Sequence, residues 1–201
     1  MKISLAIIVF MLAIKTACAA SPVATPQKMR PYSGIGILMV SITGKDKMME
    51  PYQIYEEPAI ERKGELNTGK IPPYEWIFGA IENSLPLIVT SRKGNWLRVA
   101  YDDAGREAWL DPRRTATFQT WDSYLKGQAI RLLPGLQKRY YQFFAQPGKG
   151  VAVNLLSRHL FTVVKLENDW ALAISEDNSI GWLRWRDEDG RLTICLGKVK
   201  P

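Results

Sequence analysis

One pattern of strands and turns occurs twice in this chain, at residues 87–110 and 161–183. Each copy has an alternating apolar run, a polar turn, a second run that opens on Trp96 or Trp170, another polar turn, and a short third run with its own Trp. Because side chains of a strand point alternately to its two faces, each copy predicts a three-stranded antiparallel meander. Apolar residues fall on both faces, which predicts small closed barrels whose outer surfaces are partly covered. The chain is therefore expected to be all-β, with two small barrels in tandem.

The turns and tryptophans of both copies carry a family resemblance. The first copy has GNWLRV at 94–99 and GREAWL at 105–110, and the second has NDWALA at 168–173 and GWL at 181–183. These motifs resemble those of bacterial SH3-like domains, which are small barrels found on exported bacterial proteins. The resemblance implies a groove beside a long first loop that binds extended peptides or peptidoglycan. It limits the possible ligands without choosing one, because one fold serves many functions.

The first copy departs from the family pattern in two ways. Ala108 stands where the family has a Gly before the Trp of the third run, and the stretch before Trp96 is longer than the stretch before Trp170. The additional length contains an insertion at residues 71–79, in which Pro-Pro precedes three aromatic residues. We expect this insertion to be irregular, because Pro-Pro interrupts regular structure.

These observations predict five segments. A signal peptide at 1–20 is followed by a flexible leader at 21–34 and a first SH3-like barrel at 35–116, which has an extra N-terminal strand and the insertion near 71–79. A linker at 117–134 leads to a second SH3-like barrel at 135–201. The apolar run at 35–42 supplies the extra strand or covers an open edge. Little helix is expected. One helical turn at 120–127 has a Thr or Asp cap and a Gly stop, and it places Trp121 and Tyr124 on one face between the barrels.

The first residues indicate export. Lys2, an apolar run at 3–14 and small residues around Cys18 have the form of a secretory signal peptide, and the run is too short to span a membrane. Lipoprotein anchoring through Cys18 is disfavoured because Lys15 occupies the position three residues before it. The predicted location is periplasmic or extracellular, with no transmembrane segment. The mature chain keeps one cysteine, Cys195, so a packed core rather than an internal disulfide must stabilise it.

The sequence contains few residues that favour catalysis, metal binding or cofactor binding. A thiol nucleophile would require Cys195 beside the single histidine, His159, yet Cys195 lies in an alternating apolar run where a cysteine is usually core. One His and one Cys cannot provide the four ligands of a zinc site. The acidic runs 175–178 and 187–190 are typical of turns and lack the spacing of a calcium loop. We predict no enzyme activity, no metal and no cofactor; a small envelope hydrolase with paired carboxylates remains an alternative.

The formal charge of +7 invites comparison with nucleic-acid-binding proteins. Export argues against nucleic acid as a partner, because an exported chain meets little DNA or RNA. If the charge has a partner, the anionic polymers or lipids of the envelope are better candidates.

The aromatic residues are the strongest functional signal, since seven Trp and eight Tyr exceed what two small cores require. Trp96 and Trp170, which are placed alike in the repeats, are predicted to be structural. The residues from which an aromatic groove could be built are Tyr55, Trp76, Tyr101, Trp109, Tyr141, Phe144, Trp182 and Trp185. Rigid aromatic faces bury area at little entropic cost. The predicted function is non-catalytic recognition of a peptide, peptidoglycan or a protein partner in the cell envelope; the alternative is a structural or assembly subunit whose aromatics are buried against a partner.

Overall fold

The structure, a computed structural model, describes residues 29–43, 47–48, 51–112 and 116–197. The predicted signal peptide, Cys18 and most of the predicted leader lie outside the described residues. The described part is all-β with little helix, which confirms the predicted class. No helix in it is long and apolar enough to cross a membrane.

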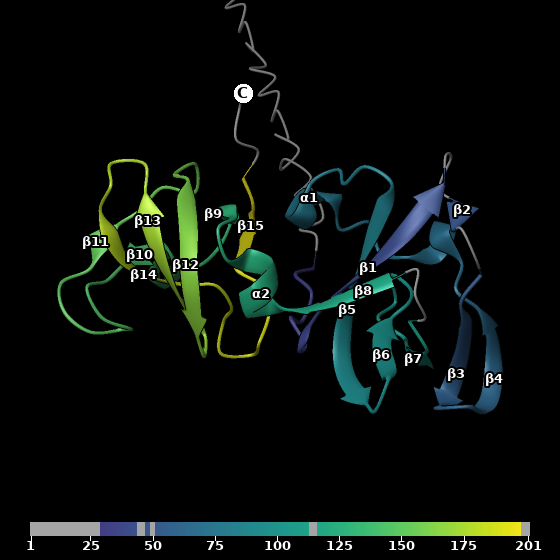
Figure 1. Cartoon of the computed structure of the whole chain (residues 1–201). Coiled ribbons are helices and arrows are strands. Elements are labelled where there is room, and N and C mark those ends of the chain that lie inside the picture. The colour runs from purple at the N-terminus through teal and green to yellow at the C-terminus, as the bar shows by residue number, and fades with distance from the viewer. Residues whose placement is uncertain (1–28, 44–46, 49–50, 113–115, 198–201) are drawn as a thin grey trace, which may run out of the picture.

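The first half of the chain forms one antiparallel sheet, in the order β2-β1-β5-β6-β7-β3-β4, with β8 paired to β1 (Figure 1). Its strands are β1 (Gly36–Thr43), β2 (Lys47–Met48), β3 (Gln53–Glu57), β4 (Ile60–Glu65), β5 (Ser84–Lys93), β6 (Trp96–Ala100), β7 (Glu107–Leu110) and β8 (Ala116–Thr120). The predicted first meander is confirmed as β5, β6 and β7. The apolar run at 35–42 forms β1, which lies between β5 and β8 and is therefore an interior strand rather than a cover over an edge.

The second half forms a five-stranded antiparallel sheet, in the order β14-β13-β12-β9-β15. Its strands are β9 (Ala129–Leu132), β12 (Phe161–Glu167), β13 (Trp170–Ser175), β14 (Ile180–Arg184) and β15 (Ile194–Leu196), and a short hairpin pairs β10 (Gln142–Phe143) with β11 (Val153–Asn154). The predicted second meander is confirmed as β12, β13 and β14.

The two sheets repeat one strand order. The path β8-β1-β5-β6-β7 matches β15-β9-β12-β13-β14 strand for strand. The third strand of each meander also pairs with an aromatic residue of the preceding hairpin, Tyr55 with Trp109 and Phe144 with Trp182. No strand pairing among the described residues closes either sheet into the barrel expected from the apolar faces. In the first sheet, the second face of β1 and β5 packs instead on the other half of the chain, through Ile37 and Ile88. The second face of β12 and β13 is exposed or half-buried.

Two short helices lie between the halves (Figure 1). Helix α1 (Glu75–Phe78) belongs to the insertion, and α2 (Trp121–Leu125) begins at Thr120, whose hydroxyl accepts a hydrogen bond from the Ser123 N–H. Two 3-10 turns, Thr68–Lys70 and Lys138–Tyr140, complete the regular elements. Helix α2 is the single turn expected at 120–127.

The buried apolar residues form two clusters. One, with Leu38, Leu87 and Val99, belongs to the first half alone. The other is the seam, which we define as the cluster shared by both halves: Ile37, Ile77, Phe78, Ile88, Trp121, Leu125, Ile130, Leu132, Phe143, Phe161, Val163, Ala171, Ala173, Leu183, Trp185, Leu192 and Ile194. Neighbouring residues of β1 and β5 face different clusters, because side chains alternate along a strand. The central strands of the first sheet are thus apolar on both faces, one of which packs on the second half.

Two predicted boundaries differ from the observed elements. Residues 117–134, predicted as a linker, hold most of β8, all of α2 and β9, so strands of both sheets lie within this segment. In the predicted leader, residues 29–34 are fixed to the second half: Ser33 donates from its backbone N–H to the Gly190 carbonyl, and the Pro31 carbonyl accepts from Leu192. Their Pro-containing composition gives no sign of these partners, which lie far away in the sequence. The division into two domains stays a prediction.

Candidate functional site

An apolar hollow lies at the edge of the seam and is called the seam pocket here. It has a volume of about 500 Å³ and is lined by Met29, Arg30, Pro31, Tyr32, Pro72, Pro73, Tyr74, Trp76, Ile88, Thr90, Ala100, Asp102, Asp103, Ala104, Gly105, Glu107 and Arg191. Five segments meet there: the N-terminal stretch, the insertion, β5, the end of β6 with the β6–β7 turn, and the end of the second half. Ligand sites are usually concave, largely apolar and of this size.

The insertion holds its aromatic residues in place through its buried face. Ile77 and Phe78 are buried in the seam, where the Phe78 ring stacks on Trp121 with centroids 6.2 Å apart. The neighbouring Tyr74 packs edge-on against Phe78, and burial raises the pKa of its hydroxyl to about 12. Trp76 remains half-buried and lines the seam pocket. The Pro-Pro step thus ends in a short helix anchored in the seam, and Trp76 packs against the edge of the seam while it lines the pocket.

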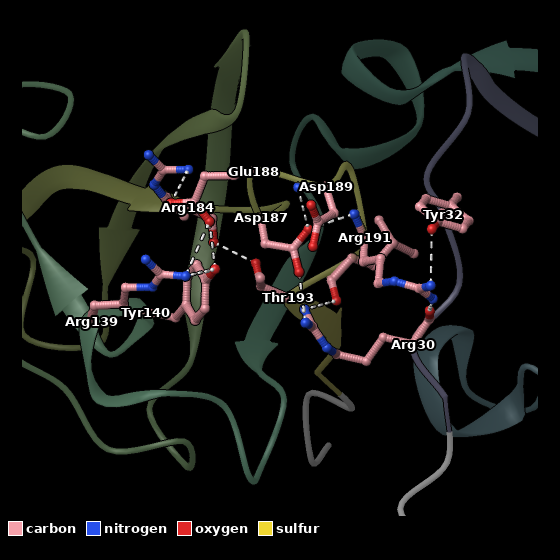
Figure 2. Close-up of polar contacts among 11 residues, drawn as sticks. Arg30, Tyr32, Arg139, Tyr140, Arg184, Asp187, Glu188, Asp189, Arg191 and Thr193 are labelled. Carbon is pink, nitrogen blue, oxygen red and sulfur yellow. Dashed lines mark hydrogen bonds and ion pairs between the residues drawn. The ribbon is translucent and has the colours of Figure 1, made fainter.

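Ionic contacts fix the N-terminal wall of the pocket (Figure 2). The Arg30 guanidinium pairs with the buried Asp187 carboxylate at 2.6 Å. The Arg191 guanidinium donates to the Arg30 carbonyl at 2.6 Å and to the Tyr32 hydroxyl at 3.0 Å, and it lies 4.0 Å from the centroid of the Tyr32 ring. Tyr32 is nevertheless 54% exposed, so its ring forms an open wall of the pocket.

The β6–β7 turn supplies the acidic wall. The Asp102 side chain is 3% exposed and accepts hydrogen bonds from the backbone N–H and the guanidinium of Arg106. Burial raises the pKa of the Asp102 carboxyl, but these hydrogen bonds outweigh burial and hold the pKa below its usual value. Glu107 pairs with Arg98 at 3.0 Å, and Asp103 is exposed.

Asp102→Asn should weaken the fold at neutral pH and remove part of its acid sensitivity. Because the pKa of Asp102 is lower in the folded chain than in the unfolded chain, its stabilisation is fully present above about pH 4 and is lost as the pH falls through the folded value. We therefore expect the urea midpoints of wild type and variant to differ near pH 7 and to converge in acid. Asp103→Asn, at the exposed neighbour, is the control and should follow the wild type. A difference that stays constant across the pH range would contradict this assignment.

A second candidate surface occurs once in each half. Tyr55 packs edge-on against Trp96 with ring centroids 5.2 Å apart, and Phe144 packs in the same way against Trp170 at 5.5 Å. All four rings are half-buried. Trp96 and Trp170, predicted to be structural, thus lie at the surface beside two of the predicted groove residues.

The pair in the second half borders a pocket of about 200 Å³ that is partly filled by charged side chains. The Arg184 guanidinium lies 4.9 Å from the centroid of the Trp170 ring and pairs with Glu188 at 3.2 Å. Glu188 also accepts a hydrogen bond from the Tyr140 hydroxyl, and Arg139 approaches the same carboxylate (Figure 2). These contacts occupy the aromatic face, so this pocket offers less free surface than the seam pocket.

The eight predicted groove residues are not gathered in one place. Trp109, Trp182 and Trp185 are buried, and Trp185 packs against Trp121 while its indole N–H donates to the Asn168 carbonyl. The Tyr141 hydroxyl donates to the Leu133 carbonyl and accepts from the Leu136 N–H, which ties it to the turn after β9. Burial and internal hydrogen bonding give these four side chains structural contacts. Tyr101 is half-buried beneath the Arg106 guanidinium. The ligand-binding role of the set stays a prediction.

The groups considered for catalysis lie in different places. Cys195 is half-buried opposite Arg131 on β9, and burial raises the pKa of its thiol. It lines a small cavity beside Ile77 and Phe78, whereas His159 lines a separate hollow beside Ser175 and Asp177. Within the described ranges, no group of three or more His, Cys, Asp or Glu side chains could hold a metal ion.

Sequence reasoning found Trp76 but missed most of the seam pocket. The Pro-Pro step before three aromatics marked the insertion as unusual. Tyr32 and Arg191 carry no such signal, because they are distant in the sequence and meet only through the pairing of residues 31–33 with 190–192.

Comparison with known proteins gives little guidance. No protein-family model matches the chain, and no curated protein sequence does either. Among solved structures, the chain is similar to one named "Endolysin LysPBC5 CBD", with 13% sequence identity over 84% of this chain and 98% of that chain, and a TM-score of 0.24. A TM-score of this size does not establish a common fold.

Proposed function

We propose that this protein is a non-catalytic binding protein of the cell envelope, built from two SH3-like modules, and that the seam pocket holds an extended peptide-like ligand. The ligand is the peptide part of peptidoglycan or a segment of an envelope protein. The observation that carries the proposal is the apolar seam pocket of about 500 Å³, with Tyr32, Tyr74 and Trp76 among its lining residues.

The chemistry of this lining suits a peptide. Tyr and Trp rings give large, rigid contact surfaces whose ordering costs little entropy. The lining also includes two acidic residues, Asp103 and Glu107, and two arginines, Arg30 and Arg191. Charges of both signs therefore border the pocket, but Arg30 and Glu107 are paired within the chain with Asp187 and Arg98. Asp103 is exposed and can face a basic group of a peptide. The form of residues 1–20 supports an exported location, where peptidoglycan and envelope proteins are the available partners.

Trp76→Ala should weaken binding of the mature protein, residues 21–201, to purified peptidoglycan sacculi by at least about tenfold, since anchoring aromatic residues contribute about 2 kcal/mol or more. Binding would be measured by co-sedimentation over a salt series, because apolar contact persists in salt that screens surface charge. Trp96→Ala is the matched control, as it removes a half-buried indole of the same half outside the pocket. Loss of binding in Trp96→Ala alone would place the ligand on the Tyr55–Trp96 pair, and wild-type binding that disappears at moderate salt would refute an apolar groove.

Exposed apolar residues beside the pocket favour a second candidate function, that of an assembly subunit. Met29, Tyr32 and Ile35 are 76%, 54% and 42% exposed, and a partner could cover them together with Trp76. Light scattering separates the two functions. A monomer leaves the pocket free for a peptide, whereas a stable oligomer that Trp76→Ala dissociates would identify the pocket as an assembly surface.

A further inference from the structure

The second half has an apolar loop surface that is separate from the seam pocket. The connection between β10 and β12 carries three strongly exposed aliphatic side chains, Val151, Val153 and Leu156, which are 90%, 61% and 52% exposed. It lies at the end of the second half that is remote from α1 and the first sheet (Figure 1). Clustered aliphatic residues on a protruding loop are uncommon on surfaces that meet only water, and they mark interaction sites.

The charge around this loop has one sign along the sequence. Between Asp122 and Glu167 the chain has no acidic residue, and the basic residues of this interval are Lys126, Arg131, Lys138, Arg139, Lys149, Arg158 and Lys165. Lys149 and Arg158 flank the three aliphatic residues, and both are exposed. Neither forms an ion pair with any residue that the structure describes. Their charges are therefore available to an anionic partner.

Acidic residues border the loop in two places. Glu188, which is paired with Arg184, lines a pocket with Gly148. Glu176 and Asp177, on the β13–β14 turn, line a hollow with Val153 and His159. Asp177 accepts hydrogen bonds from the hydroxyls of Ser175 and Ser179, which lower the pKa of its carboxyl and keep it ionised. These carboxylates leave Lys149 and Arg158 unpaired, so anionic groups have access at the loop itself.

We propose that the loop from 147 to 158, the lipid loop, docks on an anionic membrane surface. Val151, Val153 and Leu156 enter the boundary between lipid headgroups and acyl chains, while Lys149 and Arg158 contact anionic headgroups. A lipid surface is the partner that takes both parts of this arrangement, since interfacial binding combines buried aliphatic area with attraction between basic side chains and anionic lipid. A soluble polyanion would use the basic residues and leave the aliphatic ones exposed.

The test is co-sedimentation of residues 21–201 with vesicles of phosphatidylcholine alone and of phosphatidylcholine mixed with phosphatidylglycerol. Binding is expected only to the mixed vesicles. Lys149→Glu combined with Arg158→Glu should weaken it at least tenfold, because each basic residue near an anionic surface contributes roughly fivefold. Val151→Asp combined with Val153→Asp should weaken it by at least about tenfold, because both side chains leave the lipid and add charge. All four positions are exposed, so the variants should keep the wild-type fold.

Two controls make the outcomes decisive. Ile60→Asp removes an aliphatic residue of the first half that is 67% exposed, and it should bind vesicles like the wild type. Soluble polyphosphate serves as a polyanion without acyl chains. The proposal is overturned if the mixed vesicles do not sediment the protein, if the valine variant binds them as well as the wild type, or if Ile60→Asp is equally impaired. Binding to polyphosphate that depends on Lys149 and Arg158, with no vesicle binding, would identify the loop as a site for polyanions instead.

Discussion

Trp121→Ala is expected to lower the free energy of unfolding by about 4 kcal/mol, because replacing a fully packed Trp with Ala costs about 3–5 kcal/mol. Trp121 is 5% exposed, stacks on Phe78 and lies 5.6 Å from the ring centroid of Trp185, so it contacts both halves. Its indole N–H also donates to the buried Ser33 carbonyl at 2.6 Å. The loss would be measured by equilibrium denaturation in guanidinium chloride.

Two variants separate packing from hydrogen bonding in that result. Trp121→Phe keeps an aromatic ring and loses the hydrogen bond to Ser33, which should cost about 1–2 kcal/mol. Trp170→Ala, at a half-buried indole of the second sheet, should cost less than Trp121→Ala because less area is buried. Since the seam is one core, a single unfolding transition is expected. A curve with two transitions, of which Trp121→Ala moves only one, would show that the halves are stable separately.

Gly34→Ala is expected to destabilise the fold by about 3 kcal/mol or more, since a strained backbone costs about 1–2 kcal/mol and steric overlap adds a similar amount. Gly34 has φ of +58°, and a Cβ there would lie 2.2 Å from the Val89 carbonyl oxygen. The clash falls on backbone that is hydrogen-bonded to Ile35, so it cannot be relieved by a rotamer change.

Gly94→Ala is the matched control for this substitution. Gly94 has a φ of +60°, close to that of Gly34, but no atom beyond its own residue and its two chain neighbours lies within 4 Å of a Cβ built on it. Only the backbone strain should remain, about 1–2 kcal/mol. Thermal unfolding of both variants gives the comparison. Equal losses would mean that the N-terminal segment moves away from Val89 without cost, and the docking of residues 30–35 on the first sheet would then be unimportant for stability.

The sequence predicted the local parts of the fold well. The two meanders, their turns and the short helix at α2 depend on alternation, glycines and a capping Thr, which are properties of neighbouring residues. The predicted packing of this turn is also seen: Trp121 contacts Phe78 of the first half and Trp185 of the second, and Tyr124 contacts Phe78. The apolar character of both faces of β1 and β5 correctly indicated that something covers them.

The sequence does not show which residues cover each face of β1 and β5. Ile88 faces the seam and Leu87 the first core, although both are aliphatic members of one strand. The same limit applies to the site, because the alternation that places Trp109 and Trp182 in strands does not show that a hairpin residue lies across each of them. The sequence pattern also did not predict the lipid loop. Its basic residues are spaced far apart, and only the absence of acidic residues between them distinguishes the interval.

Residues 31–33 pair with residues 190–192, so the structure around the seam can form only after the second half has been synthesised. The first sheet has all its strands once residue 120 has been synthesised, but the partners of Pro31 and Ser33, which are Leu192 and Gly190, are made about 70 residues later. At about 5–20 residues per second, the apolar side of α1 therefore stays uncovered for seconds in a newly made chain. A protein cut short after the first half would keep that surface permanently exposed to chaperones and to other copies of itself. The first half alone is thus a poor candidate for a portable module, even though its sheet is complete.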